Sequence, residues 1–142
     1  MLRNPLTRAR RQRGQSLIET GLMIVVVFTV VFWVFEICQL LYTYTVISDA
    51  AHEGVRYAIV HSGGDVTGTQ ARVLQFAQTS MHNVSGLTSD VTFLTDAGAV
   101  TTDTTPPVRV RVRVTYTYMP YLQIITTPPT IKAYSEGRMV VE

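Results

Sequence analysis

The chain has 142 residues, enough for one membrane helix and one small domain near the lower size limit for an autonomous core. Its formal net charge is +2, but five of its twelve basic residues lie in residues 1–14, which leaves seven basic and ten acidic residues in the remainder. The remainder therefore has no general attraction for nucleic acid, and the single cysteine, Cys38, excludes an intrachain disulfide and a cysteine-based zinc site.

A long apolar run follows the basic start of the chain. It extends from Leu17 to Phe35, and Glu19 is its only charge. Rising about 1.5 Å per residue, a helix of this length covers the hydrocarbon core of a bilayer, and we expect it to span the membrane. Five arginines and no acid precede the run, which predicts a cytoplasmic N-terminus and an outer C-terminal domain (Arg3, Arg8, Arg10, Arg11 and Arg13).

A secretory signal peptide also combines a basic start with an apolar region, but that region is shorter and ends at small residues where cleavage occurs. Here the run continues through Glu36 and Ile37 to Cys38 without such a site, so we expect the anchor to be retained. We interpret Cys38, at the membrane boundary, as a small apolar filler; the alternative is an intermolecular disulfide.

The start of the run carries a motif. Arginines precede Gly14, and Glu19 stands at the fifth position after it, within the apolar segment. This pattern resembles the type IV prepilin processing site. The resemblance implies cleavage between Gly14 and Gln15 by an inner-membrane prepilin peptidase, and pairing of Glu19 with the N-terminal amine of its own or a neighbouring subunit. An acid inside an apolar span is costly unless it is paired or neutralised. The alternative is that Glu19 lies at the headgroup boundary, where it costs little.

Beyond Phe35 the pattern becomes amphipathic, and no Pro or Gly interrupts it from Leu22 to Glu53. We therefore predict a helix that continues to His61 and ends at the following glycines. Tyr42 and Tyr44 are placed as interfacial aromatics would be. Residues 1–9 are predicted to be a flexible basic arm, because Pro5 opposes helix. The expected organisation is a leader at 1–14, a long helix at 15–62 with its transmembrane half at about 17–38, and an extracytoplasmic domain at 63–142.

A second motif lies near the end of this helix. Small residues recur every four positions at Ala50, Gly54 and Ala58, which predicts a stripe that lets another helix or a sheet approach closely. Glu53 and Arg56 are expected to pair at i,i+3. Asp49, His52 and Glu53 do not form a metal site in this interpretation, because adjacent residues diverge by about 100° on a helix; they are assigned to a solvated face.

The spacing Ala-Ala-x-Glu-Gly-x-Arg-Tyr-Ala, with Tyr57 before the final alanine, follows about thirty residues after the Gly/Glu pair. In combination with that pair it resembles the N-terminal region of TadE-like proteins, which are pseudopilins of tight-adherence (Flp-type) pilus systems. The resemblance covers about Arg11 to Ala58 and implies a pilin-like helical spine. Beyond it, the chain agrees only in general pattern.

The rest of the chain predicts a short helix and a small antiparallel sheet of about three strands, and hence an α+β fold. The helix is expected at Thr69–Met81 and the strands at Val91–Leu94, Val108–Met119 and Ile131–Val141, with a loop at Asp96–Pro107 and a bulge or turn at Gly137. The second strand alternates strictly, so one face is buried. Its other face carries Arg109, Arg111 and Arg113, either as charges that discourage edge pairing or as a docking stripe for an acidic partner or anionic surface.

No nucleophile motif, phosphate loop or zinc motif is present, so we predict a protein without enzymatic activity, cofactor, metal or small-molecule substrate. The predicted function is that of a minor pilin or pseudopilin in the assembly or structure of a tight-adherence pilus, in the bacterial inner membrane or incorporated in the pilus. The implied partners are a prepilin peptidase, other pilins or pseudopilins and the pilus platform proteins. The alternative is a permanently anchored single-span envelope protein whose outer domain is a binding module or scaffold.

Overall fold

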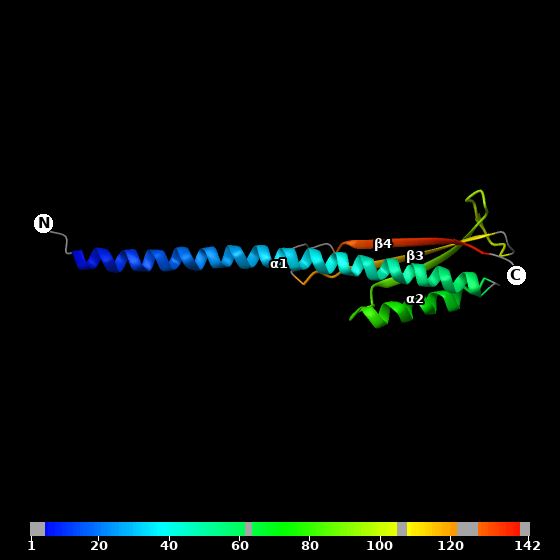
Figure 1. Ribbon diagram of the computed structural model, residues 1–142, viewed down its shortest axis with the longest axis horizontal. Helices are drawn as coiled ribbons and strands as arrows, with labels where there is room; N and C mark the ends of the chain where they lie inside the picture. The colour runs from blue at the N-terminus through cyan, green and yellow to red at the C-terminus, as the bar shows by residue number, and fades with distance from the viewer. Residues whose placement is uncertain (1–4, 62–63, 105–107, 122–127, 140–142) are drawn as a thin grey trace. The chain divides into compact units, whose positions relative to one another are not determined.

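The computed structural model describes residues 5–61, 64–104, 108–121 and 128–139, with side chains from Gly14 onward. It divides into two compact units, Met1–Cys38 and Gln39–Glu142. Within these residues, two helices and four strands follow one another (Figure 1): α1 Pro5–Val60, α2 Val66–Ser80, β1 Leu87–Leu94, β2 Val100–Thr101, β3 Arg109–Thr117 and β4 Thr130–Arg138. The prediction of an α+β fold with a long apolar N-terminal helix is confirmed.

The first unit consists of the N-terminal part of α1. This helix begins at Pro5, ten residues before Gln15, and residues 5–9 are helical rather than a flexible arm. The sequence interpretation gave too much weight to Pro5. Proline is tolerated in the first helical turn because the N–H that it lacks would have no partner there.

In the second unit, the four strands form one antiparallel sheet in the order β2-β1-β3-β4. The expected three strands become four because β2 adds two residues at the edge. It forms where the chain reverses after β1: the N–H of Thr95 donates to the carbonyl of Ala99 over 2.8 Å, and Gly98 takes the positive φ of 84° that the reversal requires. A two-residue strand in a Thr- and Gly-rich loop has no periodicity that a sequence could reveal.

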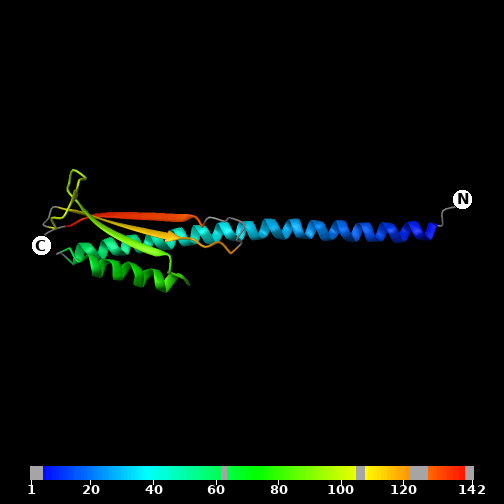
Figure 2. The same cartoon turned by 180° about the vertical axis from the view of Figure 1, so that it is seen from behind.

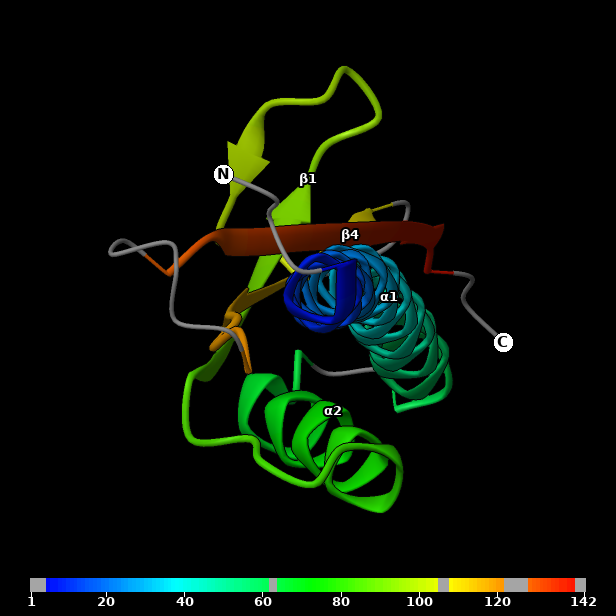
Figure 3. The ribbon, with the colours of Figure 1, turned by 90° about the vertical axis from the view of Figure 1, so that its left-hand side faces the viewer.

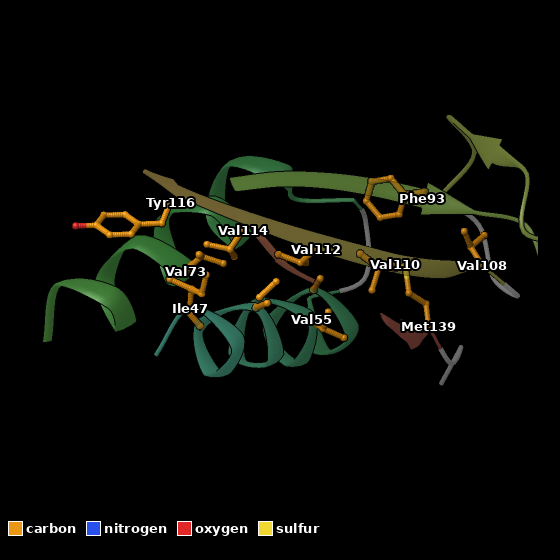
Figure 4. Close-up of a cluster of buried hydrophobic side chains, with 14 of the residues drawn as sticks. Ile47, Val55, Val73, Phe93, Val108, Val110, Val112, Val114, Tyr116 and Met139 are labelled. Carbon is orange, nitrogen blue, oxygen red and sulfur yellow. The ribbon is translucent and has the colours of Figure 1, made fainter. Parts of the chain in front are cut away.

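The helices α2 and α1 (from Gln39 onward) cover one face of this sheet (Figure 3). Alternate residues of β3 point into the interface, and Val110, Val112 and Val114 are fully buried. They meet Ile47 and Val55 of α1 and Val73 of α2, among other apolar side chains (Figure 4). The buried face predicted from the strict alternation of β3 is therefore where the core forms.

The start of α2 shows a signal that the sequence interpretation missed. The helix begins at Val66 instead of Thr69, because Asp65 caps it: its carboxylate accepts a hydrogen bond from the N–H of Gly68 over 2.8 Å. The side chain of Thr69 donates to the carbonyl of Asp65 over 2.7 Å and adds to the cap. Asp65 directly before an amphipathic segment is a recognisable N-cap pattern.

Gly137 lies within β4, paired with Val110 of β3, and not in the bulge or turn that we expected. A Cβ at this position would lie 2.5 Å from Cδ1 of Ile59 and 2.6 Å from Cγ1 of Val55, both on α1. The absence of a side chain lets α1 approach β4 closely. The glycine therefore serves helix-on-sheet packing.

Candidate functional site

The expected processing segment lies on α1 in the first unit. Gly14, Gln15 and Glu19 are all helical and exposed, and no described side chain lies within 4 Å of where a Cβ on Gly14 would be. Gln15 and Glu19 are separated by four residues, so they lie on the same face of the helix, one turn apart. The peptide bond after Gly14 is thus on an exposed part of the chain, but its backbone is held in a regular helix.

The apolar run presents its side chains outward. Each large apolar side chain from Leu17 to Phe35 is between 50% and 76% exposed. Within the part of the chain that the structure describes, α1 is the one helix long and apolar enough to cross a membrane. Such a continuous apolar surface suits lipid better than water, which indicates a single-pass membrane protein.

The small residues of the second motif are used inside the second unit. Ala50, Gly54 and Ala58 are buried in its core. A Cβ on Gly54 would lie 2.5 Å from Cγ2 of Val73 on α2 and 3.2 Å from Cγ1 of Val112 on β3. Gly54 therefore lets α1 pack closely against both α2 and β3.

The polar residues of the motif have partners other than those expected. Glu53 does not pair with Arg56; its carboxylate accepts hydrogen bonds from Nη2 and Nε of Arg72 on α2, at 2.8 and 3.1 Å. Tyr57 stacks on His61 one turn later, with ring centroids 3.9 Å apart. Arg56 is exposed. The expectation of a local i,i+3 pair therefore overlooked a tertiary partner, Arg72, which α2 brings to Glu53.

These side chains line a cleft of about 420 Å³ between the ends of α1 and α2. Its lining includes Glu53, Arg56, Tyr57, His61, Arg72 and Gln75. Arg72 is already held by Glu53 and donates to the amide oxygen of Gln75 over 3.1 Å. The described lining contains no Ser, Thr or Cys beside a base, so the cleft offers a polar surface for binding and no nucleophile of that kind.

His52 connects α1 to β4. Its Nδ1 and the hydroxyl of the buried Ser135 are 2.8 Å apart, within hydrogen-bonding distance. The sequence interpretation placed His52 on a solvated face, and the side chain is indeed exposed, but it also satisfies a buried hydroxyl. Among the residues whose placement is described, no three potential metal ligands converge.

The three arginines of β3 lie on the outer face of a central strand. Because β3 is paired on both sides, by β1 and by β4, the interpretation that they discourage edge pairing is wrong. Arg111 forms an ion pair with Glu136 of β4, and Nε of Arg109 lies 3.9 Å from the carboxylate of Asp96. Arg113 has no ion pair with any described residue. Its register partner on β4 is the exposed Tyr134.

One tyrosine of β3 has a perturbed acidity. Tyr116 is buried, and its hydroxyl donates to the carbonyl of Asn83 over 3.1 Å. Burial raises the pKa of Tyr116 above its ordinary value, and the nearby Tyr121 adds to the rise.

We expect this tyrosine to make the second unit less stable in alkali. The folded protein holds the Tyr116 proton more tightly than the unfolded chain, so the free energy of unfolding should be unaffected below about pH 10 and fall as the pH rises through the raised pKa. Urea unfolding of the full chain in detergent, at about pH 8 and about pH 11, measures the loss. The wild type should lose more stability than Tyr116→Phe, which has no proton to release; equal losses would contradict the assignment.

Comparison with known protein families gives one finding. The family model described as TadE-like protein matches residues 14–56. The match starts at Gly14, contains Glu19 and ends at Arg56, and it covers less than half of the chain. It confirms, for this segment, the resemblance inferred from the sequence. Searches of curated proteins and of solved structures found no match.

Proposed function

We propose that this chain, whose residues 14–56 match the TadE-like family, is a minor pilin or pseudopilin that acts in the assembly or structure of a tight-adherence pilus. The observation that carries the proposal is the coincidence of the match with the exposed apolar part of α1. In such a filament, the apolar helices of neighbouring subunits would cover one another and replace lipid. In this proposal the protein has no enzymatic role.

Processing between Gly14 and Gln15 would give this helix its working form. Cleavage would remove residues 1–14 and leave the amine of Gln15 one turn from Glu19, on the same helix face. A positive amine at that distance can neutralise the carboxylate, either within one subunit or between two. The proposed partners are therefore an inner-membrane prepilin peptidase, other pilins or pseudopilins and the platform proteins, with residues 1–14 in the cytoplasm and the second unit outside it.

A second candidate function is that of a permanently anchored envelope protein with an outer binding or scaffold domain. It is favoured by the second unit itself, which buries its small-residue stripe in its own core and retains a polar cleft beside Arg56. In that case the helix would remain in lipid, and residues 1–14 would remain attached.

Mass spectrometry of the protein isolated from its native membrane distinguishes the two functions. A mature chain that begins at Gln15 supports the pseudopilin, whereas a chain that begins at Met1 supports the permanent anchor. Immunogold labelling of sheared pili gives the second measurement, because only a filament subunit is found on them.

Glu19→Gln should leave the cleavage intact and reduce incorporation into the pilus, since it removes the partner of the new amine.

The arginines of β3 provide a test of subunit docking. Replacing Arg109, Arg111 and Arg113 together with glutamine should weaken pilus assembly while the fold persists, because exposed ion pairs contribute only about 0–1 kcal/mol each. Arg113→Gln alone should produce most of the effect, since the other two already have acidic partners within the sheet. Arg109→Gln is the matched control. Pilus numbers counted by electron microscopy decide the matter, and unchanged assembly in the triple variant would discard the docking stripe.

A further inference from the structure

One end of the second unit contains both the point where the chain enters the unit and the point where the chain leaves β3. It is the end at which Gln39 begins the unit, and three hydrogen bonds connect its segments. The bonds run from Tyr42 Oη to the carbonyl of Ser80 (3.1 Å), from Tyr116 Oη to that of Asn83 (3.1 Å), and from the N–H of Thr117 to that of Gly86 (3.2 Å). Figure 2 shows the orange end of β3 beside the cyan part of α1.

The chain leaving β3 exposes apolar side chains at this end. Met119 is 66% exposed and Tyr121 is 76% exposed, with Pro120 between them. On α1, Tyr42 and Tyr44 are 53% and 49% exposed. These side chains combine an apolar body with, in the tyrosines, a polar tip, which is the chemistry of residues found at a membrane–water interface.

The sequence around them is free of charge. No Asp, Glu, Lys or Arg occurs between Arg113 and Lys132. On the outer sheet face, by contrast, the exposed Tyr134 is paired with the charged Arg113. Contact with a headgroup layer would therefore desolvate no ionised group of the β3–β4 connection.

The short connection to the apolar run makes a lipid surface the occupant that fits. Tyr42 follows Phe35 by only seven residues, so the chain cannot carry Tyr42 far from the point where the run leaves the membrane. Met119 and Tyr121 lie at the same end of the unit as Tyr42. Such a contact requires only that the apolar run spans a membrane, and it does not depend on any role in a pilus.

We propose that the second unit rests on the lipid headgroups through Met119 and Tyr121, with Tyr42 and Tyr44 in the same layer. Met119 and Tyr121 then form a second membrane contact besides the helix. It limits how far the unit tilts away from the bilayer.

The experiment places a fluorophore at single cysteines of the full chain in nanodiscs that hold one copy each. In a Cys38→Ala background, the labelled positions are Met119→Cys and, as the matched control, Val100→Cys in β2. Val100 is 75% exposed and lies at the opposite end of the unit, where β1 ends and β3 begins. Lipids with a spin label near the headgroup quench only fluorophores in or next to the bilayer.

We expect quenching at position 119 to exceed that at position 100 by roughly twofold or more, as an interfacial side chain requires. A label at Tyr121→Cys should follow position 119. Equal quenching at 119 and 100 would overturn the proposal. So would a label at 119 that is shielded from water but not quenched by the lipids, because that result would identify protein as the covering surface.

Discussion

Substitution of Gly14 by valine is expected to abolish maturation, so that the chain accumulates with Met1 at its start. The bond after Gly14 lies in a regular exposed helix, and a peptidase must open that helix before it can reach the carbonyl. Glycine lowers the cost of opening, because it is about 1 kcal/mol less favourable than alanine in a helix interior. A branched side chain also prevents the close approach to the backbone that glycine allows.

Gly14→Ala should give a graded result. Added helix stability of about 1 kcal/mol reduces the opened population roughly fivefold, so cleavage should be slower but measurable. Among the described side chains, none lies within 4 Å of the Cβ position, so none of them rejects either substitution. An effect on maturation would therefore arise from the peptidase and not from misfolding.

Gly21 provides the matched control for this series. It lies on the same helix, seven residues further on, and a Cβ there also has nothing within 4 Å. Gly21→Val should be processed like the wild type when intact mass is measured after expression with the peptidase. If Gly14→Val is cleaved normally, or if Gly21→Val is equally impaired, Gly14 is not the recognition residue and the permanent anchor becomes the better interpretation.

The features that the sequence predicted well are those encoded by local periodicity. The apolar run gave α1, and the strict alternation of Val110, Val112 and Val114 gave the buried face of β3. Both patterns repeat over many residues, so they remain recognisable even where a single residue departs from them. The edge strand β2 has two residues and no such repeat, so it appears only when the chain folds back on β1.

The features that were missed depend on contacts between distant residues. The sequence paired Glu53 with Arg56, but α2 brings Arg72 nearer. The sequence interpretation also treated β3 as a strand that could lie at the edge of the sheet. In the structure β3 lies between β1 and β4, and its arginines are on the outer face of the sheet. The order of the strands and the partner of each charged side chain are decided only in the folded unit. The sequence alone allows several ion pairs, because oppositely charged residues occur at several spacings. Gly137 is the same kind of case: its role is visible only beside Val55 and Ile59.

Gly54→Val is expected to destabilise the second unit by roughly 2–4 kcal/mol, a large part of the total stability of a small domain. The new side chain would meet Cγ2 of Val73 at 2.5 Å and Cγ1 of Val112 at 3.2 Å. Both valines are fully buried, so neither can move aside into solvent. The helix would have to shift away from the sheet, and that shift would open the packing around Val55 as well.

Gly54→Ala separates this clash from the preference of a helix for alanine. Its gain of about 1 kcal/mol in helix propensity opposes an overpacking cost of about 1–3 kcal/mol, so a smaller net loss is expected than for valine. Amide hydrogen exchange of β3 and α2, in the full chain in detergent, reports the stability of the second unit without interference from the membrane helix. Gly21→Val, which adds the same side chain to α1 without a clash, should leave that exchange unchanged. Undiminished protection in Gly54→Val would mean that α1, α2 and β3 do not meet at this glycine.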